Sequence, residues 1–432
     1  MTIVGRSGGL VSGSFTYVAA NVVAAAVPFA LLPVLTRYMA PAEYGQVAMF
    51  QTFISGLAAF TGLSVDGAAA VKYYDKGLGH DEIGHFVGAC LQILLATTAL
   101  VLALAFVSRF WLASWLGLTA GWVVGAVVVS GTGFVIQLRL AQWQVRAKAL
   151  NYGATQILQA LTGAALTLVL VVGLRRGAEG RLEAQSLTSA AFAMISIYLL
   201  SRDELLRLSW RPDYLREALR FGVPLVPHVA GIFLLNSVDR LVINAKLGLA
   251  QAGLYMVGVQ LTMAMSIVFL AINNAYVPWL FQRLKRDQVA EKRQIVRWTY
   301  VYFGAVLGLS ALAFLLGPIV VKVIAPQRYR AAGQIVGWLA LAQAFGGMYL
   351  MVTNYIFYSK RTGWLALSTI VSGLLNLALL YVFIPSLGLV GAAMAVAGAA
   401  AFRFALTWAV AQRRHPMPWF ELKSSKIPSA QL

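Results

Sequence analysis

The feature of this sequence that most restricts its fold is a series of long, nearly uninterrupted apolar segments. A window of about 19 residues, matched to a hydrocarbon core about 30 Å thick, finds roughly twelve of them. Each is long enough to cross a bilayer as an α-helix, whereas a membrane barrel would need strands of about ten alternating residues. The predicted spans cover residues 10–36, 44–70, 85–107, 121–143, 153–174, 185–201, 221–245, 251–276, 299–321, 334–357, 362–382 and 388–411.

Composition supports the same fold class. Apolar residues make up 60% of the 432-residue chain and charged residues only 11%, too few to cover a soluble globule of this size. The first apolar segment is too long for a signal peptide and lacks a convincing small-residue cleavage site, so we expect it to remain as a helix. The sequence predicts an all-α polytopic membrane protein with about 12 transmembrane helices.

The net charge of +19 is explained by topology rather than by nucleic acid. If both termini are cytoplasmic, most of the 34 Lys and Arg residues fall in the inside segments, as the positive-inside rule requires. The richest segments, Arg202–Arg220 and Arg283–Arg297, are expected to contact anionic membrane lipids, with a docking surface for a partner as the alternative. Arg175, Arg176 and Arg181 are exceptions, because they fall on the predicted outer side.

Motifs for enzymatic or metal chemistry are weak. Cys90 is the single cysteine, and the four histidines show no metal-ligand spacing, so no metal or bound cofactor is expected. The connecting loops are too short for a catalytic domain, and the GxxxxGK[ST] phosphate loop is absent from the sequence. Residues 5–9 match G-x-S-x-G, but they lie in an N-terminal tail and not at a strand-to-helix turn. The chain is therefore predicted to be a transporter and not an enzyme.

An internal repeat divides the chain into two halves. Pro41–Val47 aligns with Leu249–Tyr255, and Gly180 aligns with Gly391 at a similar offset. Because each half contains six spans, an even number, the halves would be related by an axis along the membrane normal. We predict two pseudo-symmetric six-helix lobes, residues 1–210 and 211–432, around a central cavity, with a short basic cytoplasmic tail.

Charged residues inside predicted spans are the first candidates for a binding site. Arg240 follows Asp239 within the seventh span, and Arg403 lies near the middle of the last. An arginine in hydrocarbon persists mainly where it faces a partner or a water-filled cavity, and here it would suit an anionic cargo. The alternatives are an inter-helix ion pair between Asp239 and Arg240, and snorkelling of Arg403 toward the interface.

Other polar residues in apolar segments extend this candidate set. Three amides could bind sugars or simply join helices: Asn21, Asn236 and Asn376. His228, in a segment with Pro224 and Pro227, could titrate or could pack between helices. Asp66 and Asp239 are the acids within spans, and therefore the candidates for proton or sodium coupling.

Several short motifs follow one another in a fairly specific order. They are Leu35–Tyr38 with Glu43–Gly45, Phe221–His228, Asp239–Arg240, Gly253–Tyr255, Tyr329–Ala332, Asn354–Tyr355 with Lys360, Leu375–Leu377, Pro385 and Gly388–Ala393. In this order the chain resembles the Wzx-type polysaccharide flippases of the MOP exporter superfamily. Asp66 followed by Lys72, Tyr73 and Tyr74 also resembles a family element, in which arginine is more usual than lysine.

The resemblance implies a function. Such a protein would move undecaprenyl-pyrophosphate-linked oligosaccharides from the cytoplasmic to the periplasmic leaflet of a bacterial inner membrane, by alternating access, for lipopolysaccharide or exopolysaccharide synthesis. A polysaccharide polymerase and a chain-length protein would be possible partners. Substrate contacts would come from Lys72, Arg240 and Arg403 together with the amides and His228. The alternatives are a drug or metabolite cation antiporter of the same superfamily and a membrane polymerase or glycosyltransferase.

Overall fold

The computed structural model describes residues 7–75, 77–359 and 363–419, and within these ranges the regular elements are all helices. Eleven helical segments of this part of the chain are long and apolar enough to cross a membrane. The first half contains α1 (Ser7–Tyr38), α2 (Pro41–Leu57), η1 (Gly62–Ser64), α3 (Val65–Lys72), α4 (His80–Val107), α5 (Arg109–Leu116), α6 (Ala120–Val145), α7 (Ala149–Thr167), η2 (Leu168–Gly173) and α8 (Gly177–Arg202).

The second half contains α9 (Pro212–Gly222), η3 (Val223–Leu225), α10 (Val226–Asn236), α11 (Val238–Leu247), α12 (Leu249–Arg286), α13 (Val289–Ile324), η4 (Gln327–Ala332), α14 (Gly333–Tyr358) and α15 (Gly363–Arg414). The prediction of an all-α polytopic membrane protein is confirmed. Lys360, and the part of the predicted basic tail beyond residue 419, lie outside the described residues.

Helix α15 accounts for the difference between eleven helices and twelve predicted spans. Gly388, within it, has φ 57° and ψ −133°, a conformation that glycine adopts without steric cost. Beyond this residue the chain runs back along itself, since a Cβ on Gly391 would lie 2.3 Å from the carbonyl oxygen of Phe383 and one on Gly398 would lie 3.3 Å from Leu379. One helix with a reversal at Gly388 therefore supplies the last two spans.

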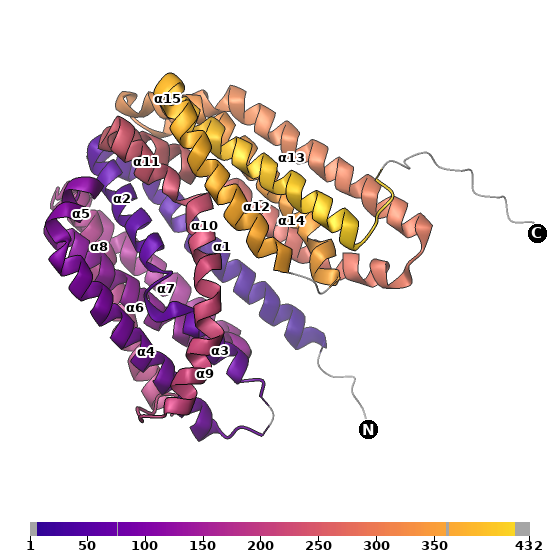
Figure 1. The fold of residues 1–432 in the computed structure, drawn as a ribbon. Coiled ribbons are helices and arrows are strands. Elements are labelled where there is room, and N and C mark those ends of the chain that lie inside the picture. Colours follow the sequence, from indigo (N-terminus) through magenta and orange to yellow (C-terminus); the bar gives the residue numbers. More distant parts are fainter. Residues whose placement is uncertain (1–6, 76, 360–362, 420–432) are drawn as a thin grey trace, which may run out of the picture.

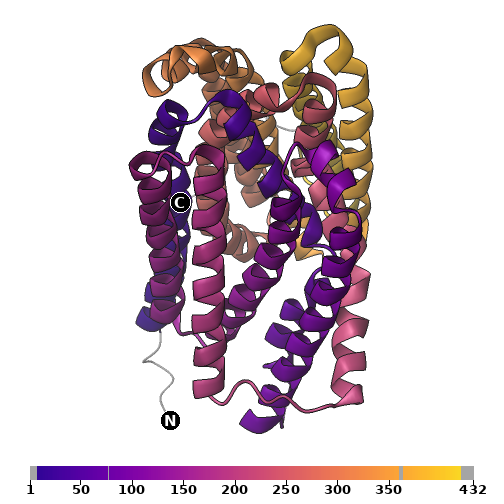
Figure 2. The same ribbon diagram turned by 90° about the vertical axis from the view of Figure 1, so that its left-hand side faces the viewer.

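Two groups of helices form separate lobes, seen in indigo to magenta and in orange to yellow (Figure 1). In the first, α6 packs against α4 and α8, and α7 packs against α1 and α8, so that the helices run side by side (Figure 2). In the second, α14 packs against α12, α13 and α15. The lobes touch mainly through α2 and α12 and diverge toward the end that holds the N-terminus (Figure 1).

The contact between α2 and α12 is reciprocal. A Cβ on Gly45 would lie 2.0 Å from the carbonyl oxygen of Leu249, and a Cβ on Gly253 would lie 2.0 Å from that of Pro41. These are equivalent positions of the internal repeat, so the two halves cross through the same small patch of each helix. Glycine is required here because the backbones approach too closely for any side chain.

Further hydrogen bonds join the lobes at this end, which we call the clasped end and define by Met39, Gly248 and η4. The Arg328 guanidinium donates to the carbonyls of Thr36 and Arg37 at 2.9 and 2.7 Å. The Tyr329 hydroxyl donates to the carbonyl of Met39 at 2.9 Å. The last carbonyls of α1 have no partners within the helix, and they form the negative end of its dipole. A cation at this end is therefore stabilising, and Arg328 of the second lobe caps α1.

The seventh span divides its contacts between the lobes. Helix α9 packs on α3 and α4 of the first lobe, whereas α10 packs on α15 of the second. The two helices are joined by the 3₁₀ turn η3, where Pro224 removes an amide donor. Figure 1 shows α9 and α10 as one long element that passes between the lobes.

One predicted placement is wrong. The seventh span was expected to run from residue 221 to 245 with Arg240 inside it, but the helix ends at Asn236. Ser237 has φ −140°, and Asp239 and Arg240 lie beyond it on the separate ten-residue helix α11. The apolar run continues through this point, so hydropathy alone did not reveal the break.

Candidate functional site

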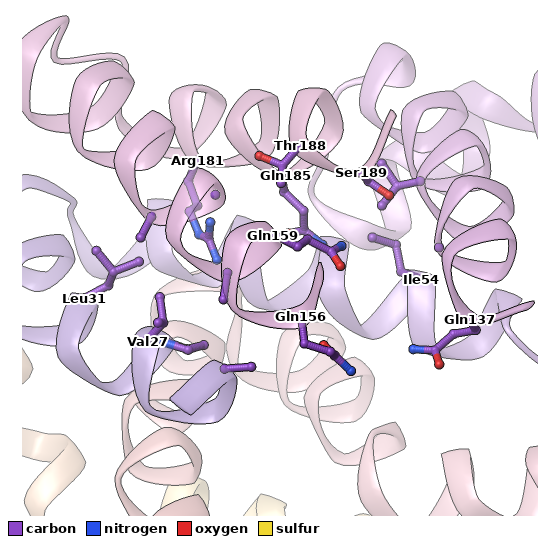
Figure 3. Close-up of a pocket in the computed structure, with 17 residues that line it drawn as sticks. Val27, Leu31, Ile54, Gln137, Gln156, Gln159, Arg181, Gln185, Thr188 and Ser189 are labelled. Atoms are coloured by element: carbon purple, nitrogen blue, oxygen red, sulfur yellow. The ribbon is translucent and has the colours of Figure 1, made fainter. Parts of the chain in front are cut away.

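A cavity of 390 Å³ lies within the first lobe, among α1, α2, α6, α7 and α8. Figure 3 shows Arg181 and the glutamines among the side chains that line it. Its polar lining includes Gln137, Gln156, Gln159, Arg181, Gln185, Thr188 and Ser189. Small residues keep this space open, since a Cβ on Gly133 of α6 would meet no atom within 4 Å. A polar cavity between apolar helices is a candidate binding site.

Arg181 is the cation of this cavity. It lies in the second turn of α8, and its Nη1 donates to the hydroxyl of Thr167 at 2.8 Å. Among the described residues, no carboxylate lies within ion-pair distance of it. By contrast, Arg176 one turn earlier pairs with Glu183 at 2.6 Å. Arg181 therefore retains donors for an anionic ligand.

Two further cavities continue the first in opposite directions. A cavity of 260 Å³ shares Pro28, Leu31, Arg181 and Gln185 with it and extends to Tyr44 and Gln260 between the lobes. A cavity of 360 Å³ shares Ile54, Val129, Gly133 and Gln137 with it and extends to Thr61 and Asp66. We call these three spaces the polar row. It carries Arg181 toward the clasped end and Asp66 toward the other.

A break in the second span positions Asp66. Leu63 and Ser64 both have positive φ, at 48° and 58°, so the helix stops after Leu57 and restarts as α3. The exposed backbone is satisfied locally, because the amide of Gly62 donates to the Thr97 hydroxyl at 3.0 Å. Irregular backbone at membrane depth is tolerated where it is buried or lines a cavity, and Asp66 follows this one directly.

The predicted pair on α11 is held in a local network. Asp239 accepts a hydrogen bond from the Tyr255 hydroxyl at 2.5 Å and one from the backbone amide of Arg240 at 2.9 Å. The Arg240 Nη1 lies 4.0 Å from the Asp239 carboxylate and donates to the carbonyl of Asn236 at 3.0 Å. The structure thus brings Asn236, Asp239 and Arg240 together, but none of them lines the polar row.

The other candidates of the second lobe are separate from this group. The guanidinium of Arg403 lies 4.1 Å above the ring of Tyr349. The amide of Asn376 is fully buried and donates to the carbonyl of Leu234 at 3.3 Å, which joins α15 to α10. His228 is partly buried near the start of α10, and its Nδ1 has no hydrogen-bond partner in the described part of the chain.

The remaining two candidates lie in the first lobe. Lys72 pairs with Glu217 of α9 at 2.6 Å and with Asp75 at 3.1 Å, so it ties α9 to α3. Asn21 is exposed on α1 and accepts a hydrogen bond from the Tyr152 hydroxyl at 3.3 Å. Of the nine predicted residues only Asp66 lines the polar row.

Arg181 and the glutamines were not among the predicted site residues. Arg181 was counted with the charges of an outer loop, four residues before the predicted sixth span. The structure begins α8 at Gly177, because the π-helical turn η2 and a close approach of Gly180 to Leu170 bring α7 and α8 together early. The available signal was the spacing of Arg181 and Gln185, which places both on one face of a helix.

Comparison with known proteins identifies the family. Residues 10–284 match the family described as polysaccharide biosynthesis protein. The chain belongs to this family. An uncharacterized membrane protein of Haemophilus influenzae is 28% identical to it over 372 residues, which cover 82% of this chain and 85% of that protein. The resemblance to polysaccharide flippases is consistent with this assignment.

Solved structures show the fold of this polysaccharide biosynthesis family member. The lipid II flippase MurJ in an inward closed conformation has a TM-score of 0.70 at 14% identity, covering 93% of this chain and 87% of MurJ. A multidrug resistance MATE transporter of the MOP superfamily, inward-facing, has a TM-score of 0.68 at 16% identity, covering 91% and 97%. The chain has the fold of these structures, as predicted.

Proposed function

We propose that this protein is a flippase for lipid-linked oligosaccharides, carried by an undecaprenyl pyrophosphate, from the cytoplasmic to the periplasmic leaflet of a bacterial inner membrane. The observation that carries the proposal is the polar row, in which glutamine amides surround one arginine that has no acidic partner in the described chain. Membership of a polysaccharide biosynthesis family supports a saccharide cargo.

The chemistry of the row suits such a cargo. Glutamine amides both donate and accept, and so can match the alternating donors and acceptors of sugar hydroxyls. The guanidinium of Arg181 can bind a phosphate through two parallel hydrogen bonds. Since each unsatisfied polar group in hydrocarbon costs several kcal/mol, the headgroup would cross through the row while the prenyl tail stays in lipid.

The arrangement of the lobes suggests how access alternates. Contacts at Gly45, Gly253 and Arg328 hold the clasped end together, and the lobes diverge from it. With both termini cytoplasmic, the structure would represent an inward-facing state. Outward opening would break the α2–α12 crossing and close the other end, a rocking motion of two lobes.

Ion coupling is proposed at Asp66. Among the described residues it is the one carboxylate that lines the polar row, and a proton or sodium ion bound there would change the charge met by the cargo. Asp239 is a weaker candidate, because Tyr255 and its neighbour's backbone already occupy its oxygens. Arg240, Arg403, Lys72, His228 and the three asparagines stay proposed substrate contacts, outside the row in this state.

A cation antiporter is the second candidate. Asp66 favours it, since a carboxylate at one end of the row could bind a cationic drug. Arg181 opposes it, because an arginine without a carboxylate partner in the row repels the same cargo. A polymerase and a chain-length protein would act on the product of the flippase.

The deciding experiment is a depletion assay in the native bacterium. Loss of the protein should cause lipid-linked repeat units to accumulate on the cytoplasmic side, and re-expression should remove them. Sensitivity to cationic dyes such as ethidium should be unchanged. Unaltered lipid-linked intermediates together with increased dye sensitivity would replace the flippase with the antiporter.

A further inference from the structure

A second cavity, of 440 Å³, lies in the other lobe between α12, α13 and α14. Four of the nine residues that line it are aromatic. Tyr276 and Trp279 come from α12, Trp298 and Tyr302 from α13, and Met351 of α14 lies behind them. We call this space the aromatic slot.

The aromatic slot does not belong to the polar row. On α12, residues 272, 276, 279 and 283 line the slot, whereas residues 256, 260 and 263 line the cavity between the lobes. At about 100° per residue these two sets lie on roughly opposite faces of the helix. Any ligand of the slot therefore approaches from outside the pair of lobes and not from the space between them.

The outer side of the slot is apolar and accessible. Trp298 is 56% exposed and Ile272 is 42% exposed, and both lie on helices long enough to span the bilayer. Hydrocarbon chains are the surroundings that such a surface meets in a membrane. Tryptophan and tyrosine prefer the boundary between acyl chains and headgroups, which the ends of α12 and α13 reach near Asp287.

Arg283 closes the slot at this boundary. Its guanidinium lies 4.4 Å above the ring of Trp279, and Nη1 donates to Gln294 at 2.7 Å. Among the described residues no carboxylate pairs with it. The neighbouring cations differ, since Arg286 pairs with Glu291 at 2.9 Å and Lys292 pairs with Asp287 at 2.5 Å. Two of the cations beside the slot are thus paired with carboxylates, whereas Arg283 at its mouth contacts only a neutral ring and a neutral amide.

We propose that the aromatic slot binds one membrane phospholipid with an anionic headgroup. The lipid phosphate pairs with Arg283, and an acyl chain lies along Trp298, Trp279 and Tyr302. Both partners of Arg283, the ring of Trp279 and the amide of Gln294, are neutral. Its guanidinium can therefore still form charge-assisted hydrogen bonds with a phosphate. The anionic inner leaflet supplies this ligand at the depth where α12 ends. The site is separate from that of the transported lipid.

The test uses the purified full-length protein in detergent, titrated with phosphatidylglycerol or with phosphatidylcholine of the same acyl chains. Native mass spectrometry measures retained lipid. The wild type should retain one phosphatidylglycerol in preference to phosphatidylcholine. Arg283→Gln should bind phosphatidylglycerol about tenfold more weakly and lose the preference. Arg297→Gln, an exposed cation of the same hairpin, is the matched control and should behave as wild type.

Trp298→Ala should weaken the binding of both lipids equally, because it removes part of the surface that contacts the acyl chain and leaves the charge of Arg283 in place. Glycerol phosphate, which lacks acyl chains, should not compete. An unchanged preference in Arg283→Gln, or full competition by glycerol phosphate, would overturn the proposal. If Arg283→Gln does not fold, quenching of tryptophan fluorescence by brominated phosphatidylglycerol decides. Trp298→Phe should remove a clear part of that quenching, and equal quenching in both proteins would also overturn it.

Discussion

Gly253 of α12 packs directly on the backbone of Gly45 of α2, so closely that a Cβ on Gly253 would lie 2.8 Å from the amide nitrogen of Gly45. The two glycines occupy equivalent positions in the two halves of the chain. Their contact therefore joins the lobes through one motif used twice.

Alanine at either glycine should loosen this crossing. Gly253→Ala forces a shift of backbone atoms and should lower the free energy of unfolding by about 1–3 kcal/mol. The double variant with Gly45→Ala should cost less than the sum, since one displacement of the helices relieves both clashes. Thermal unfolding in detergent measures this. Gly304→Ala on α13, where a Cβ meets no atom within 4 Å, is the control. Additive losses would show that the two sites act independently.

Removing the cation of the polar row should impair transport without unfolding the protein. Arg181→Gln keeps a donor to Thr167 but loses the charge, and should reduce flipping of a lipid-linked saccharide in proteoliposomes by about tenfold or more. Arg181→Lys should restore part of it, since the charge returns without the planar fork. Arg175→Gln, an exposed cation just before α8, should leave the rate unchanged. Wild-type flipping by Arg181→Gln would remove this residue from the site.

Neutralising Asp66 should uncouple transport from an ion gradient. In proteoliposomes with an imposed proton or sodium gradient, Asp66→Asn should flip at the rate that the wild type shows without a gradient. Asp239→Asn should retain the response, because that carboxylate serves Tyr255. Should Asp66→Asn respond to the gradient as the wild type does, coupling at this position is wrong.

A pair at the end of α8 gives a pH dependence outside the spans. Burial of the Asp203 carboxyl would raise its pKa, but the hydrogen bond from Arg139 and the charges of Arg139, Lys148 and Arg202 outweigh it and lower the pKa. A carboxyl with a lowered folded pKa stabilises the protein above its unfolded pKa, about 3.9, and this contribution disappears as pH falls through the folded value.

Asp203→Asn should therefore destabilise the protein near neutral pH by about 1–3 kcal/mol, since Arg139 is 1% exposed and would lose its carboxylate, while the 31% exposure of Asp203 weakens the pair. The difference from wild type should shrink below pH 4, which thermal unfolding at pH 7 and pH 3.5 measures. Asp213→Asn, at the exposed start of α9, is the control. A difference that is the same at both pH values would contradict the pair's role.

The overall fold could be predicted because the bilayer imposes it. Apolar runs of about 20 residues must be helices, and the spacing of Gly45 and Gly253 indicated the repeat that now forms the crossing. The helix breaks were not predictable in the same way. Leu63 and Ser64 adopt positive φ without being glycine, so their conformation depends on packing and not on residue type.

The candidate site was harder to predict than the fold. Arg240 was selected because the apolar run around it is continuous, but the break at Ser237 places it on α11. Arg181 was not predicted as a site residue because it precedes the apolar run of the sixth span. Helix α8 begins at Gly177, however, so Arg181 lies on the helix and lines the polar row. Hydropathy locates spans to within a turn or so, and one turn decides whether a charge faces a cavity.

The division of the seventh span between the lobes restricts the rocking motion proposed above. One half of this rod is anchored to the first lobe, where Gly222 meets the carbonyl of Leu63, and the other half to the second, where Gly231 meets Ile370. Because α9 is packed on the first lobe and α10 on the second, the segment between them must bend if the lobes separate. Pro224 sits in that interval and has no amide hydrogen to hold the turn rigid. In the proposed rocking motion, the bending of the three residues of η3 would therefore limit how far the two lobes can separate.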